Sequence, residues 1–171
     1  MSHLNNPFRL PRTVLPSRYE VSLTPDLDAA SFTGTVLISA EATEAVSEIV
    51  VNAIELEIAS VTVNGITASF TLHEESERLI ISSDVAQGPC DIAISFTGIL
   101  NDKLRGFYRS TFTDDSGVVR TIATTQMQST DCRRAFPCFD EPDFKAVFAI
   151  DLTIKSEFLA VSNSSETKRE V

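Results

Sequence analysis

The stretch TTQMQSTDCRRAFPCFDEPDFKAVF, residues 124–148, differs from the rest of the chain because it combines aromatic and charged side chains. Four phenylalanines lie in it, and Pro137 and Pro142 exclude a long regular element. A backbone without regular structure must find partners for its polar groups before it can be buried. We therefore expect a loop that is packed down at several points, and loops of this kind carry function more often than strands do.

The segments around this loop alternate apolar and polar residues, as half-buried strands do. We expect strands over residues 18–23, 32–42, 48–53, 58–63, 66–72, 78–82, 91–96, 106–112, 118–125 and 148–154, and a short one over 158–161. Asn64-Gly65 predicts a type I′ hairpin turn, and Gly34 a bulge or a close backbone approach. Roughly ten short strands with little helix predict an all-β antiparallel fold, either a two-sheet sandwich or an open twisted double sheet.

The domain organisation follows from the proline and charge distribution. Residues 1–16 contain three prolines and predict an extended lead-in, and residues 17–171 form one β domain. The polar segment 162–171 contains nothing that would pack down a terminus. We interpret it as a junction between domains of a larger protein.

Composition limits the partners and the compartment. With 24 acidic and 14 basic residues, the formal net charge of -10 repels nucleic acid, which we exclude as a partner. No apolar run reaches the length of a membrane span or of a secretory signal, so we expect a cytoplasmic protein that does not bind membranes. Cys90, Cys132 and Cys138 lack C-x-x-C spacing and are interpreted as buried free thiols, with a Cys132–Cys138 bridge as the alternative.

The loop contains several residue types that could carry chemistry. Asp140 and Glu141 could act as a general acid and base, but a turn in which they accept N–H groups or pair with arginines is the stronger interpretation. Ser129 or Thr130 could cap a helical turn that starts at Asp131 and ends at the two following arginines. The two histidines lie in no H-E-x-x-H, so we expect neither catalytic residues nor a metal site in this chain.

Two glutamines at the start of the loop could recognise a ligand. On an extended backbone, Gln126 and Gln128 would share a face and project two neutral amides into the same space. Such a pair suits a polar ligand group, and a solvated strand end is the alternative.

The sequence from residue 15 onward resembles the N-terminal domain of the aminopeptidase N family, the gluzincin zinc aminopeptidases that include the leukotriene-hydrolase branch. The residues that carry the resemblance are Thr125-Gln126-Met127-Gln128, Arg133-Arg134-Ala135-Phe136-Pro137-Cys138-Phe139-Asp140-Glu141-Pro142, Lys145 with Phe148, Leu15-Pro16 with Tyr19, Leu23-Thr24-Pro25-Asp26-Leu27, Phe32 with Gly34, and Gly106-Phe107-Tyr108-Arg109-Ser110.

The resemblance implies a saddle-like β domain that precedes a thermolysin-like zinc domain. The family's exopeptidase and zinc motifs are absent from these residues. The implied protein removes N-terminal amino acids from peptides by means of zinc-activated water, and the zinc is expected in the following peptidase domain. The expected partners are therefore a peptide with a free N-terminus and that zinc domain.

The resemblance also assigns roles within the loop. Gln126, Met127 and Gln128 match positions that line the substrate pocket, and many members have a glutamate where this chain has Gln128. The expected supporting residues are Arg133, Arg134, Phe136, Pro137, Phe139, Asp140, Glu141 and Pro142. Two other functions stay open, namely a β-sandwich interaction module of a non-enzymatic protein and a self-contained hydrolase that uses Asp140 and Glu141.

Overall fold

A computed structural model of the chain describes residues 9–171, which form strands and one short 3-10 turn. The elements are β1 (Val14–Asp26), β2 (Ser31–Ala42), β3 (Val46–Asn52), β4 (Leu56–Val63), β5 (Ile66–Thr67), β6 (Ser69–His73), β7 (Arg78–Val85), β8 (Gly88–Ile99), β9 (Gly106–Thr113), β10 (Val119–Gln126), η2 (Cys132–Arg134) and β11 (Val147–Leu152). The all-β prediction is confirmed. No helix within residues 9–171 has the length and apolar character that crossing a membrane requires.

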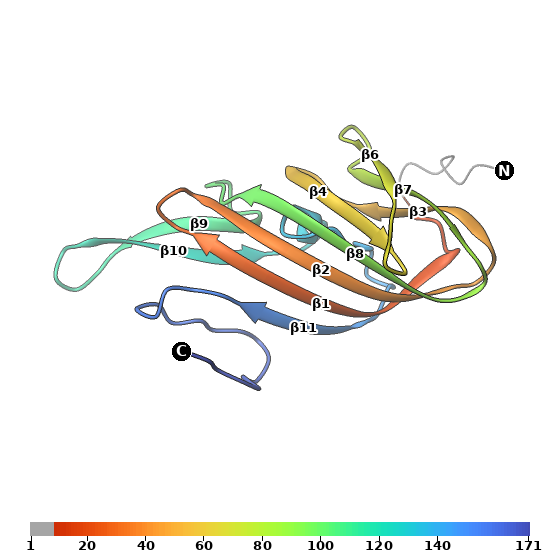
Figure 1. The fold of residues 1–171 in the computed structure, drawn as a ribbon. Helices are drawn as coiled ribbons and strands as arrows, with labels where there is room; N and C mark the ends of the chain where they lie inside the picture. Colours follow the sequence, from red (N-terminus) through yellow and green to blue (C-terminus); the bar gives the residue numbers. More distant parts are fainter. Residues whose placement is uncertain (1–8) are drawn as a thin grey trace.

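The main sheet has the strand order β11-β1-β2-β8-β4-β5 (Figure 1). Its strands pair antiparallel except for β1 and β11, which run parallel. Tyr19, Val21 and Leu23 of β1 are buried while the residues between them are exposed, as the alternation in the sequence predicts. The buried side chains of β2 and β8 continue this face across the sheet, so one face of the main sheet forms a wall of the core.

The second sheet has the order β3-β7-β6 and supplies the other wall. Ile49 and Val51 of β3 and Leu79 and Ile81 of β7 are almost completely buried. The two sheets share one apolar core, which is the sandwich arrangement that the sequence predicts. At Gly34 the packing is so close that a Cβ atom would lie 2.6 Å from the Phe96 ring, which confirms the predicted close approach.

Strands β9 and β10 form a separate hairpin that extends away from the two sheets (Figure 1). The Asp114 carboxylate closes its tip by accepting hydrogen bonds from the backbone N–H groups of Ser116 (3.0 Å) and Val118 (2.9 Å). Several apolar side chains of the hairpin are exposed, including Phe112 and Ile122. The loop of residues 127–146 then connects the hairpin to β11 at the edge of the main sheet.

The predicted hairpin turn at Asn64-Gly65 is confirmed, since these residues have φ angles of 50° and 78°. The strand that follows it differs from the prediction. Instead of one strand over residues 66–72, the chain forms β5 on the main sheet and β6 on the second sheet. The break falls at Ala68, whose N–H group donates to the Val61 carbonyl (3.0 Å), so the chain changes sheets there. The alternation of apolar and polar residues does not reveal that the chain changes sheets, because β5 and β6 both alternate with a period of two.

Three further differences concern the two ends of the domain. Strand β1 begins at Val14, inside the predicted lead-in, because Pro16 lies at an irregularity in the pairing with β2 where its missing N–H is tolerated. Residues 1–8 of that lead-in lie outside the described residues. Strand β11 pairs parallel to β1 and ends at Leu152, two residues earlier than predicted. Residues 158–161 form no strand, and their apolar side chains are exposed.

Candidate functional site

The loop of residues 127–146 is attached to both sheets by backbone hydrogen bonds. Asn52, at the end of β3, exchanges two of them with Cys138, with N–O distances of 2.8 and 3.0 Å. The Asn52 side chain donates to the Glu77 carbonyl (3.2 Å) and accepts from the Asp140 N–H (3.3 Å). The Phe139 N–H donates to the Tyr19 hydroxyl (3.1 Å). A proline-interrupted segment is thus buried because side chains of the sheets satisfy its polar groups.

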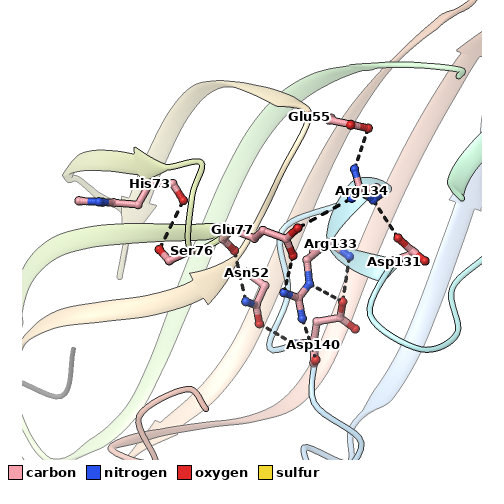
Figure 2. A network of polar contacts seen from close by, with 9 residues as sticks. All are labelled: Asn52, Glu55, His73, Ser76, Glu77, Asp131, Arg133, Arg134 and Asp140. Carbon is pink, nitrogen blue, oxygen red and sulfur yellow. Dashed lines mark hydrogen bonds and ion pairs between the residues drawn. The ribbon is translucent and has the colours of Figure 1, made fainter. Parts of the chain in front are cut away.

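Two neighbouring arginines connect the loop to the turns beside the second sheet, as Figure 2 shows. The Arg133 guanidinium lies between Asp140 and Glu77, at 2.9 Å from a carboxylate oxygen of each. Arg134 bridges Glu55 and Asp131, each at 2.8 Å. Both arginine side chains are almost buried, and in the Arg133–Asp140 pair the carboxylate is too, so this pair is far less screened by solvent than a surface pair. The prediction that an arginine holds Asp140 is confirmed for Arg133.

A second group of charges holds the other end of the loop. Glu141 accepts a hydrogen bond from the Leu10 N–H and pairs with Arg9 (2.8 Å) and Arg12 (3.3 Å). Asp143 pairs with the same two arginines. Glu141 therefore pairs with arginines of the N-terminal segment and not with those of the loop. With each carboxylate held by guanidinium groups, the arrangement favours the structural interpretation of Asp140 and Glu141 over a catalytic one.

The phenylalanines anchor the loop in the core. Phe136, Phe139 and Phe144 are buried, whereas Phe148 is half-exposed. The Tyr19 ring contacts Phe136 at a centroid distance of 6.3 Å and stacks on Phe148 at 4.7 Å. Burial raises the pKa of Tyr19 far above its usual value, so its hydroxyl stays protonated beside the loop backbone.

The 3-10 turn η2 lies where a helical turn is predicted, and Arg133 and Arg134 occupy its end as expected. Its N-cap residue is Asp131, so the prediction of Ser129 or Thr130 as the cap is wrong. The Asp131 carboxylate binds Arg134 instead of a backbone N–H. Gly106, at φ 65°, lies directly against this turn, because a Cβ there would be 2.5 Å from the Arg134 Cβ.

The three candidate pocket residues begin where β10 ends. Gln126 is the last residue of the strand, Met127 is half-buried against the core, and Gln128 lies in a turn. The condition for a shared face, an extended backbone through Gln128, is therefore not met. The side chains of Gln126 and Gln128 are nevertheless exposed, and the Gln126 side-chain amide donates to the backbone carbonyl of Gln128 (3.3 Å). The Met127 carbonyl accepts from the Asp131 N–H (3.0 Å), which connects the segment to η2.

From the sequence, Cys132 and Cys138 are paired only as an alternative bridge, and the position of Asp140 beside them is not foreseen. All three are free thiols; Cys90 and Cys138 are buried as predicted, whereas Cys132 is half-buried. The sulfur atoms of Cys132 and Cys138 and a carboxylate oxygen of Asp140 lie within 4.8 Å of one another. Burial, and next the hydrogen bond with Cys132, raises the pKa of the Cys138 thiol. The spacing Cys-x5-Cys-x-Asp matches no common ligand motif, and only the closed loop brings these residues together.

Comparison with known proteins agrees with this architecture. The model of the Peptidase M1 N-terminal domain family matches residues 15–171. Aminopeptidase M1-C of Oryza sativa subsp. japonica is 41% identical over 160 residues, which cover 91% of this chain and 18% of the relative. Aminopeptidase M1 of Arabidopsis thaliana is 38% identical over 171 residues (91% and 19%). Alanine/arginine aminopeptidase of Saccharomyces cerevisiae is 36% identical over 162 residues (90% and 19%).

The chain thus spans about a fifth of the length of these relatives. The match, by contrast, covers nearly the whole chain, including both sheets, the hairpin and the loop. The chain therefore belongs to the Peptidase M1 N-terminal domain family.

Proposed function

We propose that this chain is the first domain of a zinc-dependent aminopeptidase that removes N-terminal amino acids from peptides, and that it forms one wall of the substrate pocket. The observation that carries the proposal is the contrast between the glutamine segment, residues 126–128, and the part of the loop that follows it. Gln126 and Gln128 expose their amide groups, while the residues that follow are fixed by buried aromatic rings and ion pairs. Exposed polar groups on a fixed support suit the recognition of a ligand.

In this proposal Gln126, Met127 and Gln128 contact the substrate. The two amide oxygens accept hydrogen bonds from the free amino group of a peptide, and half-buried Met127 contacts its first side chain. The residues with a supporting role are Arg133, Arg134, Phe136, Pro137, Phe139, Asp140, Glu141 and Pro142. They act through the position of the glutamine segment and not by touching the substrate.

A second observation supports a domain that follows this one. Phe148, Ile150 and Leu152 of β11 lie beside Tyr19, Val21 and Leu23 of β1 in register. The β1 residues are at most 5% exposed, whereas the β11 residues are 39–48% exposed. On this face of the main sheet, the rest of the chain therefore covers β1 but leaves β11 exposed. We assign this apolar surface to contact with the following peptidase domain.

The zinc and its activated water belong to that following domain. The family is expected to bind zinc through the two histidines of an H-E-x-x-H motif. Residues 9–171 contain one histidine, His73, which lies exposed at the end of β6. The contribution of this chain is therefore binding and orientation of the peptide. The free thiols, buried at Cys90 and Cys138, support placing the protein in the reducing cytoplasm.

The test uses the longer protein that contains this chain. We expect it to release the first residue from a peptide with a free amino group and not from the N-acetylated peptide, and we expect a chelator to abolish the activity. Gln126→Ala and Gln128→Ala should each raise KM about 3- to 10-fold, the effect of losing one hydrogen bond. Gln87→Ala, an exposed glutamine between β7 and β8, is the matched control. Equal KM values for all three variants would contradict the role of the glutamine segment.

If the longer protein cleaves no peptide, the aminopeptidase proposal fails as a whole. The non-enzymatic interaction module would then be favoured, with the apolar β11 face as its contact surface.

A further inference from the structure

Cys132 and Cys138 have no role in the proposed pocket, and they form a cluster with Asp140, which supports the glutamine segment in that proposal. Cys132 begins η2, and Cys138 and Asp140 belong to the segment that pairs with Asn52. Their sulfur and oxygen atoms lie within 4.8 Å of one another. We propose that these three residues bind one thiophilic divalent cation of the zinc type.

The spacing fits such an ion. Zinc binds thiolate sulfur at about 2.3 Å and carboxylate oxygen at about 2.0–2.2 Å, so two ligand atoms on one tetrahedral ion lie about 3.5–3.8 Å apart. The three ligand atoms lie within 4.8 Å of one another. Side-chain rotations that move them by about 1 Å therefore bring all three onto one ion. Two sulfurs and one carboxylate also form a soft ligand set that favours zinc over magnesium or calcium.

The contacts around the cluster hold the ligand residues mainly through their backbones and through one oxygen of Asp140. The backbone of Cys138 is fixed by Asn52, and the Cys132 carbonyl accepts from the N–H groups of Ala135 and Phe136. The hydrogen bonds that Arg133 gives to the Asp140 carboxylate both end on Oδ2. Within residues 9–171, Oδ1 accepts no hydrogen bond, and we assign this oxygen to the metal.

Nearby charge also favours the site. Two thiolates and one carboxylate carry three negative charges, so a divalent cation leaves one negative charge. The Arg133 guanidinium, 2.9 Å from Asp140 and almost buried, offsets part of that charge, which it shares with its second partner Glu77. Carboxylates that bind metals are generally held by hydrogen bonds of this kind. Cys132 is half-buried, so the ion enters on its side, where a water completes four ligands.

The same two thiols could instead form a disulfide, in which they would lose two protons and two electrons to an oxidant such as a hydroperoxide. A disulfide requires no third group. Asp140 lies beside the two thiols and is held there by Arg133, which favours a metal site over a disulfide.

The test uses this chain without a tag, reduced with a phosphine and titrated with Co²⁺ and then Zn²⁺. We expect one ion per chain, a thiolate-to-cobalt charge-transfer band, and loss of that band when zinc displaces cobalt. At a free zinc concentration about a hundred times Kd, the melting temperature should rise by about 5–10 °C, because the ion binds the folded state.

Cys132→Ala should remove the band and weaken binding at least about 100-fold, and Cys132→Ser serves if the alanine variant does not fold. Cys90→Ala, which removes the thiol outside the cluster, is the matched control and should bind as the original chain does. Asp140→Asn should weaken metal binding but leave disulfide formation by a hydroperoxide possible.

Two results would overturn the proposal. One is equal metal binding by the original chain and Cys132→Ala. The other is a reduced chain that binds no metal but is oxidised by hydroperoxide to an internal Cys132–Cys138 disulfide, which would identify a redox pair instead. Because the experiment needs neither a peptide nor the following domain, its outcome is independent of the aminopeptidase proposal.

Discussion

Residues 126–128, at the end of β10 and the start of the loop, differ from residues 131–144 of the same loop in what their side chains do. The first segment exposes two amide side chains. The second places three phenylalanines in the core and joins four arginines to six carboxylates. The first segment therefore offers side chains to a ligand, and the second holds the backbone in place. Exposed side chains bind a ligand well only if neighbouring residues fix their backbone.

The comparison predicts that substitutions in the second part affect stability and those in the first part affect binding. The largest effect on stability is expected for Phe136→Ala, which should lower the free energy of unfolding by about 3–5 kcal/mol, as truncation of a buried aromatic does. Phe136 is 4% exposed and contacts Tyr19. Denaturant unfolding of this chain measures the change. Phe112→Ala, at a ring that is 49% exposed on the hairpin, is the control and should change stability much less.

The next largest effect is expected for Arg133→Ala. It leaves Asp140 and Glu77 without their shared partner, and breaking an ion pair of this degree of burial lowers stability by about 3 kcal/mol. Arg18→Ala removes an exposed pair with Glu20 and should change stability by less than about 0.5 kcal/mol. If both arginine variants unfold at the same denaturant concentration, the loop is not held by its charges.

A smaller effect is expected for Tyr19→Phe. The ring contacts remain, but the buried Phe139 N–H loses its acceptor, which lowers stability by about 1–2 kcal/mol. The matched control is Tyr108→Phe on β9, where the ring is half-exposed and a change below about 0.5 kcal/mol is expected. Thermal unfolding of the two variants side by side gives the difference, and a Tyr19→Phe chain as stable as the original would show that this hydrogen bond contributes nothing.

The smallest effect on stability is expected for Gln128→Glu, within about 0.5 kcal/mol, because the side chain is exposed. In the longer protein the new carboxylate should tighten binding of peptides with a free amino group, since charge-assisted hydrogen bonds are roughly twice as strong as neutral ones. Inhibition constants of a non-cleaved peptide and of its N-acetylated form measure the effect, with Gln87→Glu as control. Unchanged or weaker binding of the free-amine peptide would show that Gln128 does not contact the amino group of the substrate.

The sequence predicts most of the fold because its strands bury one face. Alternation around Tyr19, Val21 and Leu23 locates β1, and Asn64-Gly65 locates a turn. It does not predict that β11 pairs parallel to β1, since alternation is the same for either direction of pairing. Contacts between residues far apart in the sequence, such as Asn52 with Cys138, leave no pattern in the sequence around either residue. For the same reason the Cys132–Cys138–Asp140 cluster is visible only in three dimensions.

The parallel pair of β1 and β11 also bears on how the polypeptide is made. Strand β1 emerges early in synthesis, but its outer hydrogen-bonding edge has no neighbour until β11 has been translated. The ion pair of Arg12 with Glu141 likewise joins positions 129 residues apart in the sequence. Contacts this distant form slowly, so we expect the part of the loop around Glu141 to become fixed late in folding. A nascent chain interrupted before Val147 would expose an open sheet edge, a site where aggregation begins.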